Sequence, residues 1–168
     1  MQEPLLTIKT APKAHIAIMR KSWGLTEKIL SGEKKIELRW YENKYDPWDN
    51  ICENDDIYFK NAGEPITIKA KVAKVIQHDQ LNPKKVKKIL DQFANDDGIS
   101  QDEIAKYHKR FKDKNYCIQI YLSNPQKIRP FNINKAGFGT MSAWLVVEDI
   151  EKIKLPIQSR IVQKKMFK

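Results

Sequence analysis

The chain has 168 residues, of which 41% are hydrophobic and 31% charged, which suits one soluble globular domain and excludes a largely disordered chain. Its formal net charge of +10 favours polyanionic partners such as nucleic acid. No apolar run approaches the roughly 20 residues that span a bilayer, and the N-terminus lacks a signal-peptide pattern. We therefore expect a cytoplasmic protein with no membrane partner.

The cysteines and histidines are too scattered to form a metal site. Cys52 and Cys117 stand far apart, without a nearby histidine or cysteine at ligand spacing, so we expect free thiols. The three histidines, His15, His78 and His108, suggest neither a metal cluster nor a Ser-His-Asp arrangement. The sequence therefore predicts no metal and no cofactor.

The first predicted elements are a strand and a helix. Residues 1–13 form an irregular lead-in, and residues 15–19 alternate weakly as a buried strand. A helix fits 22–31, with Ser22 as its N-cap and Gly32 supplying the left-handed turn that ends it. The apolar residues expected to face the core are Trp23, Ile29 and Leu30.

Residues 35–41 predict a strand with one apolar face and one charged face. Alternation places Ile36, Leu38 and Trp40 on the apolar face. The opposite face carries Lys35, Glu37 and Arg39. A solvated edge strand has the same pattern, so the charges alone do not define a site.

An acidic loop and a hairpin come next. Residues 42–56 are rich in aspartate and glutamate, which repel phosphate. Strands are expected at 57–59 and 66–76, joined by a turn at 61–65. The alternation of the second strand slips near Ala73, which predicts a bulge there.

Two helices follow the hairpin. The first begins at Asn82 with a proline in its first turn, and the second begins with a capping box formed by Ser100 and Glu103. The lysines on the first helix are Lys84, Lys85, Lys87 and Lys88. They suit contact with a phosphate backbone and suit a solvated helix face equally, and the sequence leaves this choice open.

The segment 114–147 contains no acidic residue and interleaves cationic with aromatic side chains. Such a surface can neutralise phosphates and stack bases. Within it, two glycines flank Phe138 in the run 135–144. Its backbone amides and the hydroxyls of Thr140 and Ser142 could line a ligand pocket, or the run is a tight loop that enters the next strand.

The order of elements predicts an α+β fold around a small antiparallel sheet or barrel. The residues of the helix-to-strand corner resemble a family signature, the Gly-x-Lys-x-x-Glu-x-Arg pattern of ASCH domains in the PUA-like superfamily. The matching residues are Gly32, Lys34, Glu37 and Arg39. Residues 55–59 are also similar to the family's Gly-Asp-x-Ile element, with Asp55 where glycine is usual.

The resemblance implies a small PUA-like antiparallel β-barrel with helices at its rim. The ASCH-like domain would cover residues 14–148, with a helical insertion at about 82–111. Residues 149–168 would form a basic C-terminal extension. The cationic residues at its end are Arg160, Lys164, Lys165 and Lys168.

The resemblance also implies a cleft used for RNA or nucleoside-like ligands. Trp40, Tyr41 or Phe138 would offer a stacking surface. The expected ligand-binding residues are Lys34, Glu37, Arg39, Tyr41, Phe138, Thr140 and Ser142. The alternative interpretation is an internal ion-pair network of Lys34, Glu37 and Arg39 that only braces the corner.

The expected function is binding of RNA or a modified nucleotide. The first alternative is a small hydrolase, since some relatives are amidohydrolases on acetylated cytidine, with a lysine, a threonine and a downstream glutamate, and others are reported to cleave RNA. Lys34 matches that lysine, but Glu37 replaces the threonine and the third position falls near Asp97. Lys34 and Glu37 would thus be catalytic only if the protein is an enzyme. The second alternative is a protein-interaction module in transcription or translation.

Overall fold

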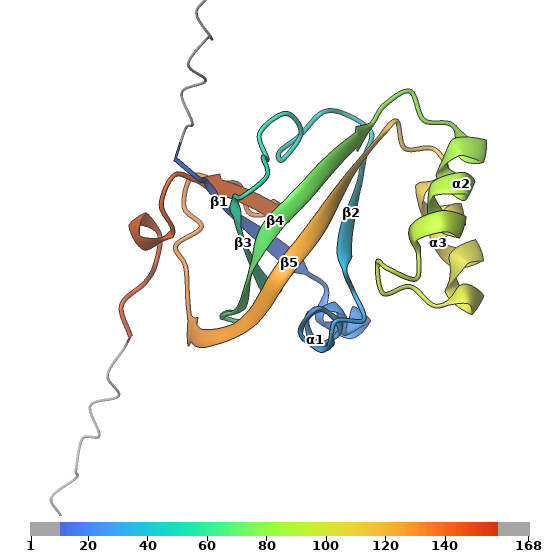
Figure 1. Cartoon of the computed structure of the whole chain (residues 1–168). Helices are drawn as coiled ribbons and strands as arrows, with labels where there is room; N and C mark the ends of the chain where they lie inside the picture. The colour runs from blue at the N-terminus through green and yellow to red at the C-terminus, as the bar shows by residue number, and fades with distance from the viewer. Residues whose placement is uncertain (1–10, 158–168) are drawn as a thin grey trace, which may run out of the picture.

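A curled β-sheet forms the frame of the molecule (Figure 1). The computed structural model describes residues 11–157. The strands are β1 (Ala14–Met19), β2 (Ile36–Tyr41), β3 (Asp56–Asn61), β4 (Ile66–His78), β5 (Tyr116–Phe131) and β6 (Trp144–Val147). The helices are α1 (Leu25–Ser31), α2 (Pro83–Phe93) and α3 (Ile104–Phe111), with short 3-10 turns η1 (Lys21–Trp23), η2 (Gln101–Glu103) and η3 (Ile150–Lys152).

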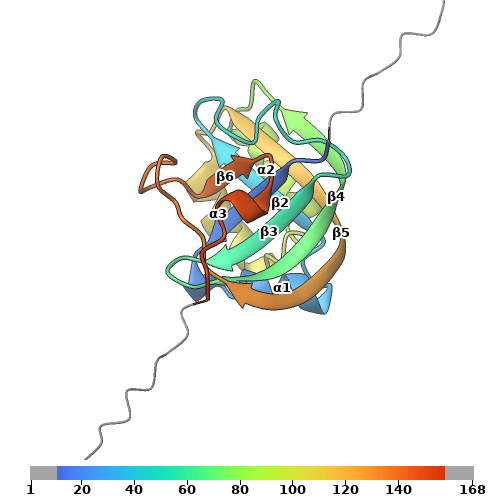
Figure 2. The ribbon, with the colours of Figure 1, turned by 90° about the vertical axis from the view of Figure 1, so that its left-hand side faces the viewer.

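The strand order in the sheet is β2-β5-β4-β3-β1-β6. Strands β1 and β3 run parallel, and the other neighbouring pairs are antiparallel. The long strands β4 and β5 curve together, so the sheet closes into a half-barrel (Figure 2). This arrangement confirms the predicted α+β fold with a barrel-like sheet, although the sheet is mixed. The predicted bulge near Ala73 is confirmed by a shift in the β4–β5 register between Val72 and Lys74.

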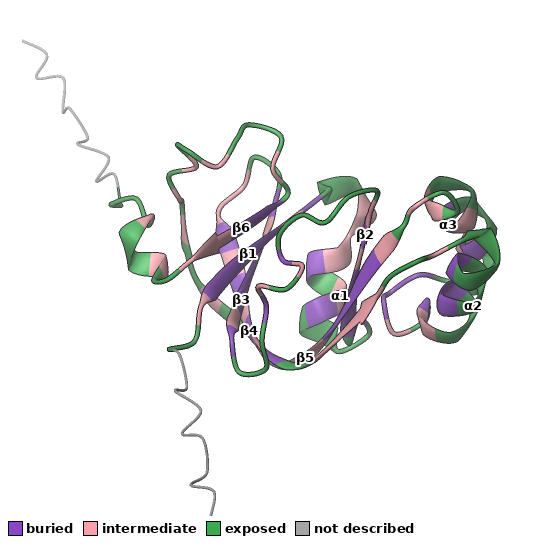
Figure 3. Ribbon diagram, turned by 90° about the horizontal axis from the view of Figure 1, so that it is seen from above, coloured by how far each residue is buried: buried purple, intermediate pink, exposed green. Residues whose placement is uncertain are grey.

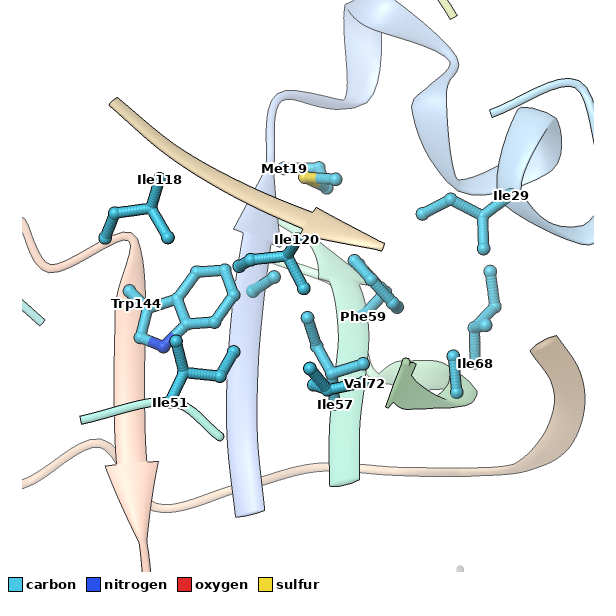
Figure 4. Close-up of a cluster of buried hydrophobic side chains, with 12 residues drawn as sticks. Met19, Ile29, Ile51, Ile57, Phe59, Ile68, Val72, Ile118, Ile120 and Trp144 are labelled. Carbon is cyan, nitrogen blue, oxygen red and sulfur yellow. The ribbon is translucent and has the colours of Figure 1, made fainter. Parts of the chain in front are cut away.

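Apolar side chains fill the inside of the half-barrel and also cover the outside of β2. The inner cluster includes Ile29, Ile57, Phe59, Ile68, Ile118 and Ile120 (Figure 4). The outer cluster joins β2 to the helix pair and includes Ile36, Leu38, Trp40, Val86, Leu90 and Ile104. Figure 3 shows this helix pair at one end of the sheet. Strand β2 is therefore covered on both faces, and Glu37 on its charged face is only 3% exposed. Lys35, which was expected on the same face, precedes the strand and is exposed.

The helix after β1 differs from the prediction at its start. Gly24 adopts a left-handed conformation (φ 61°), which ends η1 and delays the start of α1 to Leu25. Ser22 consequently lies within η1, and its side chain does not cap α1. Leu30 was expected in the core but is 40% exposed, because the adjacent Ile29 is fully buried and neighbouring helix positions point about 100° apart. The predicted turn at Gly32 is confirmed (φ 79°).

The two helices between β4 and β5 begin as predicted. The Asn82 side chain accepts a hydrogen bond from Lys85 N (2.9 Å), and the capping box of Ser100 and Glu103 is present, although η2 precedes α3. The loop between the helices runs along the outer edge of β2. There the carbonyl oxygen of Asp96 accepts hydrogen bonds from the backbone N–H groups of Lys35 (2.7 Å) and Ile36 (3.1 Å).

The remaining predictions concern the cysteines, membrane-spanning helices, metal ligands and the C-terminal extension. Cys52 is exposed and Cys117 is buried, and both are free thiols. Within residues 11–157 no helix is long and apolar enough to cross a membrane, and no three His, Cys, Asp or Glu side chains are placed to share a metal ion. The cationic residues of the expected extension, Arg160, Lys164, Lys165 and Lys168, lie outside the described residues.

Candidate ligand-binding pocket

The corner between α1 and β2 directs three charged side chains to the inner side of the sheet. Gly32 turns the chain at the end of α1, and Lys34 is anchored by its backbone N–H, which donates to Lys28 O (2.9 Å). Because β2 buries its apolar residues against the helix pair, alternation sends Glu37 and Arg39 to the other face.

Lys34 lies in a closed nest of oxygen atoms. Its Nζ atom is 2.9 Å from Glu37 Oε2, makes an ion pair with Asp97 Oδ1 and donates to the carbonyl oxygen of Asp97 (3.1 Å). Asp97 Oδ1 also accepts a hydrogen bond from Leu38 N (3.1 Å). The Lys34 residue is only 2% exposed. Its three donors are therefore occupied within the protein, and it has no free donor for a phosphate.

Arg39 connects this nest to the other end of the sheet. Its Nε atom donates to Glu37 Oε1 at 2.6 Å. Its two terminal nitrogens donate to the carbonyl oxygens of Ala143 and Ile18 at 3.4 Å each, and its guanidinium lies 5.2 Å from the ring centre of Trp144. Apart from its ion pair with Lys34, Glu37 Oε2 has no hydrogen-bond partner among the described residues. That oxygen can accept a hydrogen bond from a ligand.

The electrostatics of the nest set the charge of each group. Burial alone would lower the pKa of Lys34. The attraction of its ammonium group to the carboxylates of Asp97 and Glu37 is larger, so the pKa of Lys34 is raised. Burial similarly opposes the charge on Glu37, but Lys34 and Arg39 outweigh it and lower the pKa of Glu37. For Asp97, burial prevails over the attraction to Lys34 and raises the pKa to about 7. Asp97 is thus the group that titrates near neutral pH.

These groups line a pocket of about 930 Å³, which we call the central pocket. This volume lies within the roughly 300–1,000 Å³ of small-molecule sites. The aromatic residues along its wall include Trp23, Tyr41, Tyr45, Phe138 and Trp144. Two exposed cations, Arg20 and Arg110, also line it. The pocket thus combines a buried charged wall with aromatic surfaces and cations on its solvent side.

Most, but not all, of the sequence-predicted residues meet in the central pocket. Those that line it are Lys34, Glu37, Arg39, Tyr41, Phe138 and Ser142. Thr140 is exposed and does not line it. The Ser142 hydroxyl already donates to Trp144 O (2.7 Å). Burial raises the pKa of Tyr41 to about 12, so its hydroxyl remains protonated; it donates to Asp46 O (3.1 Å).

Trp40 also borders the central pocket, but its ring is not free to stack on a ligand. It lies against Phe111 with ring centres 5.3 Å apart and an angle of 12° between the ring planes. Trp40 therefore serves the packing of β2 against α3. The ion-pair network that formed the alternative interpretation of the corner is present, and it also forms one wall of the central pocket.

Sequence reasoning missed several residues of the pocket. Arg20 and Arg110 carried no recognisable signal, because they are far apart in the sequence and belong to no motif. Trp23 was expected in the core but lines the pocket. Asp97 had a weak signal, as the position nearest to the third catalytic residue of the hydrolase relatives. The structure places it in direct contact with Lys34.

Trp144 is held in place from behind by a buried histidine. The indole N–H of Trp144 donates to His15 Nδ1 (3.1 Å), and His15 Nε2 lies 2.9 Å from Asp55 Oδ2. This arrangement fits a neutral imidazole that donates from Nε2 to the carboxylate. Burial lowers the pKa of His15, although Asp55 opposes the shift. The histidine therefore fixes the ring on which Arg39 rests.

The half-barrel with its charged helix-to-strand corner points to the fold of an ASCH domain. Solved structures agree: an ASCH protein of Zymomonas mobilis superposes with a TM-score of 0.60 at 16% identity, over 83% of this chain and 91% of that one. A Ser-to-Ala variant of that protein superposes with a TM-score of 0.61 at 17% identity, over 84% of this chain and 93% of that one. No family model and no curated protein matches the sequence. The chain has the fold of an ASCH domain, as the corner residues predicted.

Proposed function

We propose that the chain binds RNA or a modified nucleotide in the central pocket. The observation that carries this proposal is the buried carboxylate of Glu37, which Lys34 and Arg39 hold in the wall of a pocket lined by aromatic rings and cations. A base has a π-face for the rings and polar edges for the carboxylate. The net charge of +10 supports attraction of a polyanion.

In this proposal the three residues of the corner have different roles. Glu37 Oε2 accepts a hydrogen bond from an amino group on the base edge. Arg39 is held by Glu37 and by the ring of Trp144, so it presents its remaining donor capacity in a fixed orientation. Lys34 does not touch the ligand; it keeps Glu37 ionised by its charge. Phe138 or Tyr45 offers a ring on which the base stacks.

One observation favours the hydrolase as a second candidate. Lys34 contacts Asp97, which stands near the third catalytic position of the amidohydrolase relatives. The raised pKa of Lys34 makes it a poor general base. In this alternative Asp97, whose pKa is raised to about 7, is the better candidate for proton transfer. Ribonuclease activity would use the same groups.

The test compares Glu37→Gln with Glu53→Gln, a matched change at an exposed loop position. Each protein is incubated with short single-stranded RNAs and with acylated nucleosides, and binding and product masses are recorded. We expect the wild type and Glu53→Gln to bind and Glu37→Gln to lose affinity by about tenfold or more, as expected for a lost hydrogen bond to a charged group. Turnover abolished by Glu37→Gln and by Asp97→Asn would identify an enzyme. A wild type that binds neither RNA nor nucleoside at low salt overturns the proposal.

A further inference from the structure

Two arginines from distant parts of the chain rest on the same tryptophan. The Arg20 guanidinium, between β1 and η1, lies 5.3 Å from the ring centre of Trp23, and that of Arg110, in the last turn of α3, lies 5.2 Å from it. Tyr107 packs edge-on against the same ring at 6.0 Å. The helix pair and the β1–η1 turn thus bring two positive charges to one aromatic platform.

Neither guanidinium makes an ion pair with any residue in the described part of the chain. Arg20 and Arg110 are both exposed, and both line the central pocket. Two like charges beside one ring repel each other, and a bound anion would relieve that repulsion. The stacking on Trp23 also restricts both side chains before any ligand arrives, which lowers the entropy lost on binding.

Arg20 and Arg110 differ in their charge balance from the other two cations of the central pocket, Lys34 and Arg39. Lys34 and Arg39 are matched by the carboxylates of Asp97 and Glu37, so their charges are balanced inside the protein. The positive charge that remains free for a ligand lies on the solvent side, at Arg20 and Arg110. The sequence had favoured Lys34 and Arg39 for phosphate contact, and their ion pairs argue against that role.

We infer that Arg20 and Arg110 form a phosphate-binding subsite at the solvent side of the central pocket. The inference rests on the proposed function, in which the base of the same ligand reaches Glu37. Guanidinium groups bind phosphate oxygens through paired N–H donors. The phosphate belongs either to the monoester of a free nucleotide or to the phosphodiester backbone of RNA, and these share the same chemistry.

The test compares the double variant Arg20→Gln/Arg110→Gln with Lys106→Gln/Lys109→Gln. The control removes the same charge from two exposed lysines on α3 that do not line the central pocket. Thermal unfolding of both variants establishes that they fold. In a first measurement, inorganic phosphate is titrated while the indole N–H signals of the four tryptophans are followed by NMR, with Trp23→Phe to assign that of Trp23. We expect a saturable shift of the Trp23 signal in wild type and control and none in the arginine variant.

A second measurement uses an eight-nucleotide single-stranded RNA at several salt concentrations. Loss of two phosphate contacts should reduce the slope of log affinity against log salt by about 1.4 in the arginine variant, since each contact on a single strand contributes about 0.7. The lysine control should keep the wild-type slope. The same titration with a nucleoside 5′-monophosphate and with its parent nucleoside separates the two sources of phosphate.

The outcomes distinguish the subsite from the proposed function. If RNA binds and the arginine variant keeps both the affinity and the salt slope of the control, the subsite is overturned while the proposed function stands. If RNA does not bind but phosphate shifts the Trp23 signal only when both arginines are present, the proposed function fails and the subsite stands. Absence of the phosphate shift together with an unchanged slope also rejects the subsite.

Discussion

Lys34 and Asp97 are separated by 63 positions in the chain and make a buried ion pair in the central pocket. The two residues arrive from opposite directions, Lys34 from the corner after α1 and Asp97 from the loop between α2 and α3. Their contact couples the helix pair to the charged face of β2. It also gives the pocket one acid that changes charge near neutral pH and one base that does not.

The raised pKa of Asp97 predicts a pH dependence of stability. Folding moves this pKa from 3.8 to about 7, so between these values the folded protein holds a proton that the unfolded chain releases. The free energy of unfolding therefore falls as pH rises through this window, by roughly 1.4 kcal/mol per pH unit at most. Asp97→Asn removes the effect. Urea unfolding at a series of pH values should show a wild-type minus variant difference that declines from pH 4 to 7, and a constant difference contradicts the assignment.

The carboxylates around Lys34 predict a large cost for removing its charge. Lys34→Met leaves Glu37 and Asp97 buried without their main counter-charge, and we expect a loss of about 3–5 kcal/mol in the free energy of unfolding. Adding Asp97→Asn to this variant should restore part of the loss, because an amide avoids the cost of burying or protonating a carboxylate that has lost its counter-charge.

The neighbouring residue supplies the control for the Lys34 experiment. Lys35→Met is the same substitution at an exposed side chain, and we expect a change within about 0.5 kcal/mol. Denaturant unfolding of all four proteins at pH 7.5 measures the effects. A double variant no more stable than Lys34→Met would show that charge is not the cause.

Gly98 allows the helix loop to approach Lys34 closely. It has φ of 79°, and a Cβ atom there would lie 3.2 Å from Lys28 Cδ and 3.4 Å from Lys34 Cβ. Gly63 has a similar φ of 76° but open space around it. Both alanine variants should lose about 1 kcal/mol from the backbone conformation, and Gly98→Ala should lose more because of the contacts. Equal losses in thermal or urea unfolding would show that the loop yields to the added methyl group.

His15 should stay neutral to a lower pH than an exposed histidine, because burial lowers its pKa. Its folded pKa lies below 6.5, so on acidification the unfolded chain takes up the proton first and stability falls as pH drops below 6.5. Trp144→Phe removes the N–H that donates to Nδ1 and frees this nitrogen to bind a proton. We expect the pKa of His15 to rise in this variant, as measured by NMR of the imidazole carbons. An unchanged or lower value would mean that the indole does not control the histidine.

The local elements of this fold follow from short patterns in the sequence. The strand at β2, the turn at Gly32 and the caps at Asn82 and Ser100 each depend on residues within one or two turns of chain, so they were predicted. The early break at Gly24 was not, because glycine is also tolerated inside a helix and nothing local distinguishes the two cases. The exposure of Leu30 was also missed, because an apolar residue next to the buried Ile29 can lie at the edge of the apolar stripe of the helix.

The pocket depends on contacts that no local pattern contains. Glu37 belongs to a charged face, and charged faces are normally solvated, so its burial required Lys34 and the distant Asp97. The signature identified Lys34, Glu37 and Arg39 together. It could not show that Lys34 is enclosed, that Thr140 lies outside the pocket, or that Arg20 and Arg110 meet on Trp23. The parallel pairing of β1 with β3 is likewise a property of the whole chain.

The loop between α2 and α3 has a consequence for how molecules meet one another. Strand β2 ends the sheet on one side, and unpaired N–H groups on such an edge attract strands of other molecules. Asp96 O accepts from Lys35 N and Ile36 N, and Asp97 Oδ1 accepts from Leu38 N, so these donors are already occupied. A substitution that loosens this loop would free these donors to pair with a strand of another molecule, so Asp97, which balances Lys34, also helps to close this edge of the sheet.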